Sequence, residues 1–398
     1  MKYVMVILSG AADEPCEELG GRTPLEAARI PNLQRLAREG RLGEIQTVPD
    51  EVFPGTDVAA MSLLGYDPRR CYMGRGPLEA ANAGIRLDPT EWVFCADFVT
   101  IEDEKMRDPT AGRLRSEEGR KFVHLLNQKV NVPGLRFVPG AGHRNILVWK
   151  VDEPIEVVCV PPQHVLDQPV ASFLPSGRGA EVILDLMMRS RVYLAENEIN
   201  HVRIDLGENP ANMVWIWGGG RLPRLDPFPR RFHVTAGVIA AVPAVRGVVR
   251  LADLDLLEVA GMTGHLDSNL RGKGERTLEA MKLYDLVVVH VGAADAASLD
   301  GNVRGKVAAL EAADALVVGP LLAAAEDRGE ICIAVVSDVR ASVKRRRHLG
   351  GSVPFVIFGK GVPASLARAE AFSEKAAEAG DLHIGSGFDF MEYYLRKL

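Results

Sequence analysis

Two apolar strands with a long apolar helix between them decide the fold. They are DLVVVHVG (285–292) and ICIAVVS (331–337), and the helix is KVAALEAADALVVGPLLAAAEDRG (306–329), which we expect Gly329 to end. A nearly uninterrupted apolar strand is typical of a sheet that is covered on both faces. A strand, a helix and a second strand in this order favour parallel pairing. We therefore predict a doubly wound, mostly parallel α/β sheet.

The N-terminal part continues the same pattern. An apolar strand, Tyr3–Leu8, ends in Ser9-Gly10, at the edge where open α/β sheets build ligand sites. In TPLEAARIPNLQRLAREG (23–40), Thr23-Pro24 predicts one helix start, Pro31 predicts a second, and Gly40 predicts its end. A last strand is predicted at VPFVIFG (353–359).

The middle of the chain has a different pattern of predicted secondary structure. Between residues 92 and 207 we expect short alternating strands and only two helices, near 117–129 and 180–196. The sequence thus predicts an inserted α+β domain at 92–207 and a discontinuous core domain at 1–91 and 208–398. We expect MVWIWGGG (213–220) to return the chain to the core sheet.

Composition excludes several classes of protein. The 398 residues carry a net charge of −6, so nothing favours nucleic acid as a partner. The five cysteines form no CxxC pair, and residues 3–8 are too short for a signal peptide or membrane span, so we expect a cytoplasmic protein without membrane contact. The basic run 344–347 is either a solvated loop or a rim that attracts anions.

Seven stretches carry a resemblance to a known family. In chain order the sequence resembles the archaeal-type, cofactor-independent phosphoglycerate mutases of the alkaline phosphatase superfamily, in GGRTPLEAARIPNLQRLAREG, PGTDVAAMSLLGYDP, MGRGPLEAANAGI, PANMVWIWGGG, GMTGHLDSNLRGKG, VHVGAADAASLDGNVRGKVAALEAAD and SDVRASVKRRRHLGGSVPF. The resemblance implies an alkaline-phosphatase-like core with an inserted domain. It also implies interconversion of 3- and 2-phosphoglycerate through a phosphoenzyme, without 2,3-bisphosphoglycerate.

The resemblance implies a metal-activated hydroxyl at Thr56, in PGTDVA. In the family two divalent ions, Mn²⁺ or Mg²⁺ (Zn²⁺ in relatives), make that hydroxyl nucleophilic and neutralise the transferred phosphoryl group. A helix N-cap is the alternative role for Thr56. Asp57 beside it is either a substrate-binding residue or a helix cap.

Three further positions of the family's metal centre survive, and three do not. Asp295, Asp338 and His348 are kept. The remaining positions of the family pattern carry residues that coordinate metals poorly or not at all: Ser9, Leu299 and Val339. We therefore predict that bound metal is weak or absent.

Other positions of the resemblance concern the phosphorylated substrate. Lys273 and Arg75 match positions that the family uses in catalysis, and Arg144 and His164 match substrate-binding positions, with His164 shifted by one residue. Surface or capping roles are the alternatives for these cations.

The sequence is compatible with three hypotheses. The first is a pseudoenzyme that binds, regulates or assembles with a partner, which could be a second copy or another protein. The second is an active mutase or related phosphotransferase with a reduced metal site and Thr56 as nucleophile. The third is a metal-free binder of a phosphorylated three-carbon acid.

Overall fold

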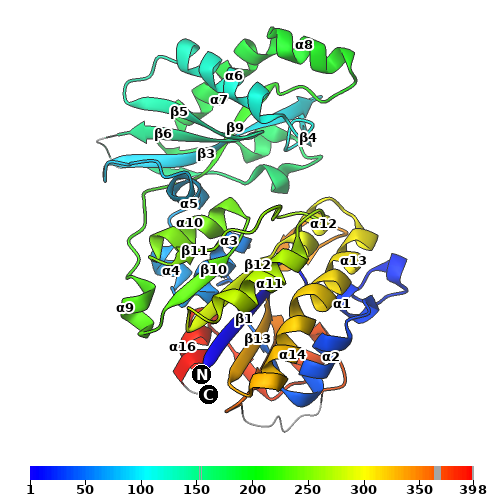
Figure 1. Cartoon of the computed structure of the whole chain (residues 1–398). Helices are drawn as coiled ribbons and strands as arrows, with labels where there is room; N and C mark the ends of the chain where they lie inside the picture. Colours follow the sequence, from blue (N-terminus) through cyan, green and yellow to red (C-terminus); the bar gives the residue numbers. More distant parts are fainter. Residues whose placement is uncertain (152, 154, 363–368, 397–398) are drawn as a thin grey trace. The chain divides into compact units, whose positions relative to one another are not determined.

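The computed structural model describes residues 1–151, 153, 155–362 and 369–396. The chain divides into two compact units, one made of Met1–Tyr72 with Arg224–Leu398 and the other of Met73–Pro223 (Figure 1).

The first unit is built on an eight-stranded sheet in the order β11-β10-β12-β1-β13-β16-β2-β17. Most neighbours are parallel, and β16 runs antiparallel to both β13 and β2. This confirms the predicted α/β class and its mostly parallel sheet. Its strands are β1 (Lys2–Leu8), β2 (Arg41–Ile45), β10 (Ala236–Ile239), β11 (Asp255–Leu256), β12 (Leu286–Val291), β13 (Ile331–Ser337), β16 (Val353–Gly359) and β17 (Leu382–Ile384). A separate two-stranded sheet is formed by β14 (Arg340–Ser342) and β15 (Arg347–Leu349).

Helices enclose this sheet. They are α1 (Pro24–Ala27), α2 (Pro31–Glu39), α3 (Thr56–Leu63), α4 (Pro68–Cys71), α9 (Phe228–Phe232), α10 (Pro243–Leu251), α11 (Leu270–Ala280), α12 (Ala293–Leu299), α13 (Val303–Ala313), α14 (Gly319–Arg328), α15 (Glu374–Glu378) and α16 (Phe390–Arg396). Short 3₁₀ turns occupy Glu17–Leu19 and Gly387–Asp389.

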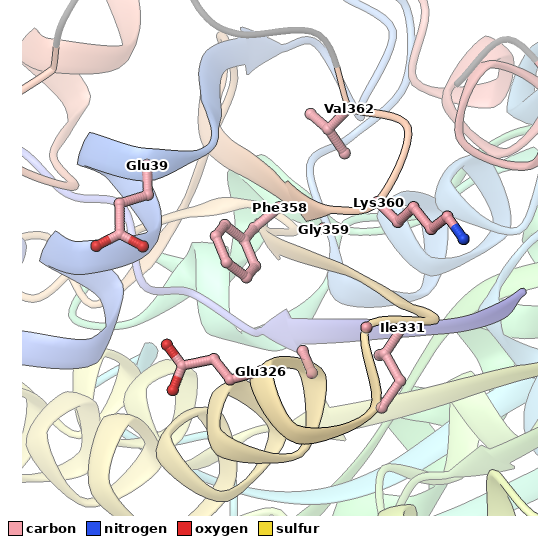
Figure 2. A pocket seen from close by; sticks show the side chains of 9 residues that line it. Glu39, Glu326, Ile331, Phe358, Gly359, Lys360 and Val362 are labelled. Atoms are coloured by element: carbon pink, nitrogen blue, oxygen red, sulfur yellow. The ribbon is translucent and has the colours of Figure 1, made fainter.

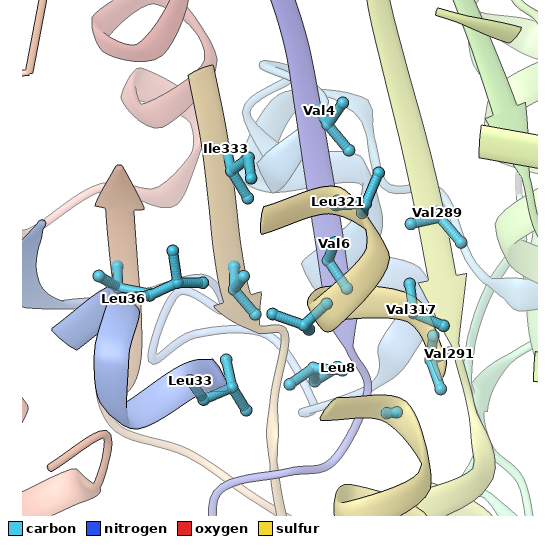
Figure 3. Packing of buried hydrophobic residues seen from close by; sticks show 14 of the residues in the cluster. Val4, Val6, Leu8, Leu33, Leu36, Val289, Val291, Val317, Leu321 and Ile333 are labelled. Atoms are coloured by element: carbon cyan, nitrogen blue, oxygen red, sulfur yellow. The ribbon is translucent and has the colours of Figure 1, made fainter. Parts of the chain in front are cut away.

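Both faces of β1 are buried, because its side chains alternate between them. Val4, Val6 and Leu8 join one core cluster with side chains of α2 and of the α13–α14 region (Figure 3). Met5 and Ile7, on the opposite face, are equally buried. The uninterrupted apolar run from Val4 to Leu8 is therefore explained by two covered faces.

The helix predicted at 306–329 begins earlier and is interrupted. It starts at Val303, passes through a π-helical turn at Asp314–Val318, and ends at Gly329 in the left-handed conformation. The π turn presents the Asp314 carboxylate to α2, where it accepts hydrogen bonds from the backbone N–H groups of Asn32 and Leu33. Residues Val303–Asp327 are long and apolar enough to cross a membrane by length and composition, but this segment packs in the core of the first unit.

The second unit holds a five-stranded antiparallel sheet, in which β3 pairs with β4, β6 and β9, and β5 pairs with β6. Its elements are α5 (Arg75–Asn82), β3 (Glu91–Glu102), β4 (Lys105–Asp108), α6 (Ser116–Lys129), β5 (Leu135–Ala141), β6 (Arg144–Lys150), β7 (Glu156–Val158), β8 (Ser176–Arg178), α7 (Ala180–Ala195), α8 (Glu198–Asp205) and β9 (Met213–Gly220), with 3₁₀ turns at Pro162–Val165 and Val170–Phe173.

The second unit is larger than the insertion expected at 92–207. The prediction that MVWIWGGG returns to the core sheet was wrong, because β9 pairs with β3 along Met213–Gly220. α5 also packs on β3 and β9 and therefore belongs to this unit. A third helix, α8, follows α7 where only two helices were expected.

Candidate functional site

The candidate site lies at the carboxyl ends of three adjacent parallel strands, β12, β1 and β13. Ser9 follows β1, Asp338 follows β13, and Asp295 lies on α12, directly after β12. Parallel strands end at the same edge of a sheet, and for that reason residues far apart in the sequence meet here.

Asp338 is fully buried, and hydrogen bonds from the protein satisfy its carboxylate. Ser9 Oγ donates to Oδ2 at 2.8 Å, while the backbone N–H groups of Gly10 and Val339 donate to Oδ1 at 2.9 and 2.6 Å. The Thr47 hydroxyl donates to the main-chain carbonyl of Asp338. Ser9 therefore acts as a donor to a carboxylate in this arrangement.

Asp295 and His348 form a second, nearly buried pair. Asp295 Oδ1 lies 2.7 Å from His348 Nε2, and the two side chains are only 15% and 14% exposed. Burial raises the pKa of Asp295, but the charge and hydrogen bond of His348 outweigh it and leave that pKa below its ordinary value. Burial lowers the pKa of His348, yet Asp295, with smaller contributions from Asp338 and Asp57, raises it overall. The pair thus holds its charges through mutual attraction.

Gly10, which follows β1, allows the chain to approach α12 closely at Asp295. Its φ is +65°, and a Cβ atom there would lie 2.6 Å from the Asp295 Cα. Only glycine fits this position without moving α12.

Thr56 and Asp57 are buried in the first turn of α3, which follows Gly55. The Tyr72 hydroxyl donates to Asp57 Oδ2 at 2.8 Å. The side chains of Val58 and Ala59 pack with Val339, the residue after Asp338. This packing places the start of α3 next to the loop that carries Asp338.

The positions that depart from the family pattern differ in their surroundings. Val339 is 1% exposed and belongs to a small apolar cluster with Val48, Val58 and Ala59. Leu299 is partly exposed at the last residue of α12. Within the described residues, no group of three or more His, Cys, Asp or Glu side chains is arranged to hold a metal ion.

Lys273 is fully buried on α11 and donates from Nζ to the carbonyl of His290 at 2.8 Å. Burial lowers the pKa of Lys273 to about 8. The His290 imidazole is also buried, and neither ring nitrogen has a hydrogen-bond partner in the described part of the chain. Its Nε2 lies 3.7 Å from Asp338 Oδ2, which is too long for a hydrogen bond.

The structure contains a buried ion pair beside the site, which the sequence motifs did not predict. Lys306 Nζ donates to Asp13 Oδ2 at 2.8 Å and to the carbonyl of Ala341, and both charged side chains are fully buried. Asp13 N–H in turn donates to Glu374, whose pKa burial raises. The one available signal was a lysine among the apolar residues of a core helix.

The remaining predicted residues lie in the second unit. Arg75 Nε donates a hydrogen bond to Glu79 Oε1 at 3.1 Å, and its guanidinium group lies over the Trp217 ring. Arg144 on β6 is the register partner of Asp97 on β3. His164 lies, partly buried, in the 3₁₀ turn Pro162–Val165. Arg75 and Arg144 therefore belong to one polar cluster of this unit, and His164 lies on a separate turn.

One cavity of the first unit lies away from this site. A pocket of about 300 Å³ is lined by Glu39, Glu326, Phe358 and Lys360, among others (Figure 2). It adjoins Ile331, the first residue of β13, whereas Asp338 follows the last residue of that strand. The pocket thus lies at the opposite edge of the sheet.

Comparisons with known proteins agree with the fold and with the sequence motifs. The profile of 2,3-bisphosphoglycerate-independent phosphoglycerate mutases matches residues 37–200. The 2,3-bisphosphoglycerate-independent phosphoglycerate mutase of Methanothrix thermoacetophila is 41% identical over 392 residues, 98% of each chain. That of Methanosarcina barkeri is 37% identical over 392 residues, again 98% of each chain.

Solved structures give the same result. A protein of Pyrococcus horikoshii superposes with a TM-score of 0.77 at 28% identity, over 99% of this chain and 96% of that one. The cofactor-independent phosphoglycerate mutase of Thermoplasma acidophilum superposes with a TM-score of 0.61 at 26% identity over the whole of both chains. The chain belongs to the 2,3-bisphosphoglycerate-independent phosphoglycerate mutase family.

Proposed function

We propose that this chain is a pseudoenzyme of the mutase family, which has lost the two-metal chemistry and serves as a binding or regulatory protein. The single observation that carries the proposal is the hydrogen bond from Ser9 to Asp338. A carboxylate at position 9 would face Asp338 with like charge unless a metal lay between them. A serine instead supplies a proton donor to a fully buried acceptor.

The donor set does not fit the metal centre that the family implies. Leucine and valine at positions 299 and 339 have no donor atom, and Val339 packs among apolar side chains. The surviving carboxylates are occupied, Asp338 by three protein donors and Asp295 by His348. An ion would have to displace these hydrogen bonds at a site short of donor atoms, so we derive no catalytic step through a metal here.

The active-enzyme alternative retains Thr56 as a hydroxyl in the first turn of α3. A free hydroxyl is a weak nucleophile at neutral pH and needs an adjacent base or a metal. Among the described residues, the hydroxyl of Thr56 donates no hydrogen bond to a His or carboxylate side chain; His348 contacts Asp295, and Asp57 accepts from Tyr72. The arrangement thus favours the pseudoenzyme.

Electrostatics disfavours the metal-free anion binder. Three carboxylates, Asp57, Asp295 and Asp338, act on His348, which is the cation they share. Without metal ions, these carboxylates repel a phosphoryl group. We accordingly propose a cytoplasmic protein that needs neither a divalent metal nor 2,3-bisphosphoglycerate, and whose partner is a protein, either a second copy or another chain.

The test combines metal analysis with an activity assay. The purified protein is analysed for bound metals and assayed for interconversion of 3- and 2-phosphoglycerate with added Mn²⁺. We expect no stoichiometric metal and no turnover above the protein-free rate. Stoichiometric metal together with turnover that Thr56→Ala abolishes would overturn the proposal and favour the active enzyme.

A further inference from the structure

The helix α8 buries two of its polar residues and exposes two apolar ones, with a third exposed apolar residue at its C-terminal cap. Asn200 and Arg203 are 1% exposed, whereas Val202, Ile204 and Leu206 are 56%, 56% and 66% exposed. A surface helix of a globular protein normally has the opposite arrangement.

Specific hydrogen bonds hold this orientation. Asn200 Nδ2 donates to the carbonyls of Leu194 and Ala211, and its Oδ1 accepts from the backbone N–H of Ala211. Arg203 donates to Glu118 at 2.9 Å and to the carbonyls of Ala111 and Asn209. Rotating α8 to bury Val202 and Leu206 would leave these buried polar groups without hydrogen-bond partners, which is unfavourable. The outward apolar face is thus a fixed feature of the fold.

The same face is acidic. Glu198, Val202 and Leu206 follow one another at intervals of four residues, so they form one stripe along the helix. Asp205 and Glu196 are also exposed. No ion pair joins Glu196, Glu198 or Asp205 to a cation within the described part of the chain, so their charges are not neutralised locally. At the adjoining end of α7, Val192 is 65% exposed.

We infer that this surface, the α8 face (Glu198, Val202, Asp205 and Leu206), docks a basic amphipathic helix of another protein. Apolar side chains of the partner would cover Val202 and Leu206, and its lysines or arginines would meet Glu198 and Asp205. A second copy of the chain fits less well, because α8 against α8 around a twofold axis brings like charges together. None of these residues is a ligand position of the mutase family, so the inference does not depend on the loss of phosphoryl transfer.

The probe is a labelled helical peptide of leucine and lysine, titrated with the full chain and followed by fluorescence anisotropy. We expect binding that weakens as salt is added, since part of the attraction is between exposed charges. Val202→Ser/Leu206→Ser should weaken it at least about tenfold, which corresponds to about 1.4 kcal/mol. Glu198→Gln/Asp205→Asn should also weaken it and should remove most of its salt dependence. Leu283→Ser, at a 73% exposed leucine of the first unit, is the matched control and should bind like the unaltered chain.

Three results would overturn the inference. One is equal binding by the Val202→Ser/Leu206→Ser variant, and another is equal binding of a peptide with glutamate in place of lysine. The third is self-association of the chain in sedimentation that Leu206→Ser abolishes, because the occupant would then be a second copy. All five substituted side chains are exposed, so the variants should keep the thermal midpoint of the unaltered chain, which calorimetry checks.

Discussion

The hydroxyl of Ser9 donates a 2.8 Å hydrogen bond to Asp338 Oδ2, in a place where both residues are fully buried. We expect Ser9→Ala to lower the free energy of unfolding by about 1–3 kcal/mol, since it leaves a buried carboxylate one donor short. Ser9→Asp should cost more, because it adds a like charge. Urea denaturation in the presence of a chelator measures both.

Ser298→Ala is the control for loss of a buried serine. Its hydroxyl donates to the carbonyl of Ala294, one turn back in the same helix, and no carboxylate depends on it. We expect a smaller loss than for Ser9→Ala. An Ser9→Asp variant as stable as the unaltered chain without metal would contradict the role assigned to Ser9.

Restoring the three departed positions together should restore metal binding. In the triple variant Ser9→Asp/Leu299→His/Val339→His, Mn²⁺ at a hundred times its dissociation constant should add about 2.7 kcal/mol to the stability. Calorimetry with and without Mn²⁺ should show a raised thermal midpoint in this variant and none in the unaltered chain. An equal rise in both would mean that the present residues already hold the ion.

Asp97 in the second unit should make stability depend on pH. Burial raises the pKa of Asp97 to about 7, although Arg144, the Trp217 N–H at 3.0 Å and Arg75 act in the opposite direction and Glu79 adds to the rise. The folded protein therefore binds this proton more tightly than the unfolded chain. The stabilisation that the protonated Asp97 gives to the folded state is fully present below pH 3.8. It is lost as the pH rises to about 7, and the free energy of unfolding falls by up to about 4 kcal/mol.

Asp97→Asn isolates this contribution, because asparagine keeps an acceptor for Trp217 and does not titrate. The difference in unfolding free energy, variant minus unaltered chain, should increase between pH 4 and pH 8 by about that amount. Titrations by other groups cancel in the difference. A difference independent of pH would show that Asp97 ionises normally in the folded state.

The buried pair Asp13–Lys306 should behave as one unit. Lys306→Met leaves the Asp13 carboxylate buried without its cation, so we expect a loss of about 3–5 kcal/mol. The double variant Lys306→Met/Asp13→Leu removes both charges. Its loss of unfolding free energy should be smaller than the sum of the losses in the two single variants, by a coupling energy of about 2–3 kcal/mol. Additive losses in urea denaturation would mean that the two charges do not stabilise each other.

The local pattern of the sequence determined much of the core unit. Apolar runs predicted β1, β12, β13 and β16, and the helix signals at Thr23-Pro24 and Gly329 act as expected, with a reciprocal cap at Thr23 and a left-handed Gly329. These features depend on residues that are neighbours in the chain, and side-chain chemistry there suffices.

Motifs at the ends of strands also predicted Asp295, Asp338 and His348 as site residues, and the structure places Asp295 beside His348. It did not reveal that Lys306 reaches Asp13, because their meeting depends on which strands and helices become neighbours. The sequence did not predict α8 for a related reason. Its residues Asn200 and Arg203 are buried because they bond to distant segments, so the apolar residues do not mark the buried side of this helix.

By itself, then, the sequence determined the strand–helix order, the family motifs and the absence of three of the family's metal-binding side chains. Only the tertiary structure decided that β9 joins the sheet of the second unit, and that Ser9 serves Asp338 as a donor. The physical reason is the same in both cases. Strand pairing and buried hydrogen bonds are settled by which groups the folded chain brings within contact, and spacing along the sequence does not encode that distance.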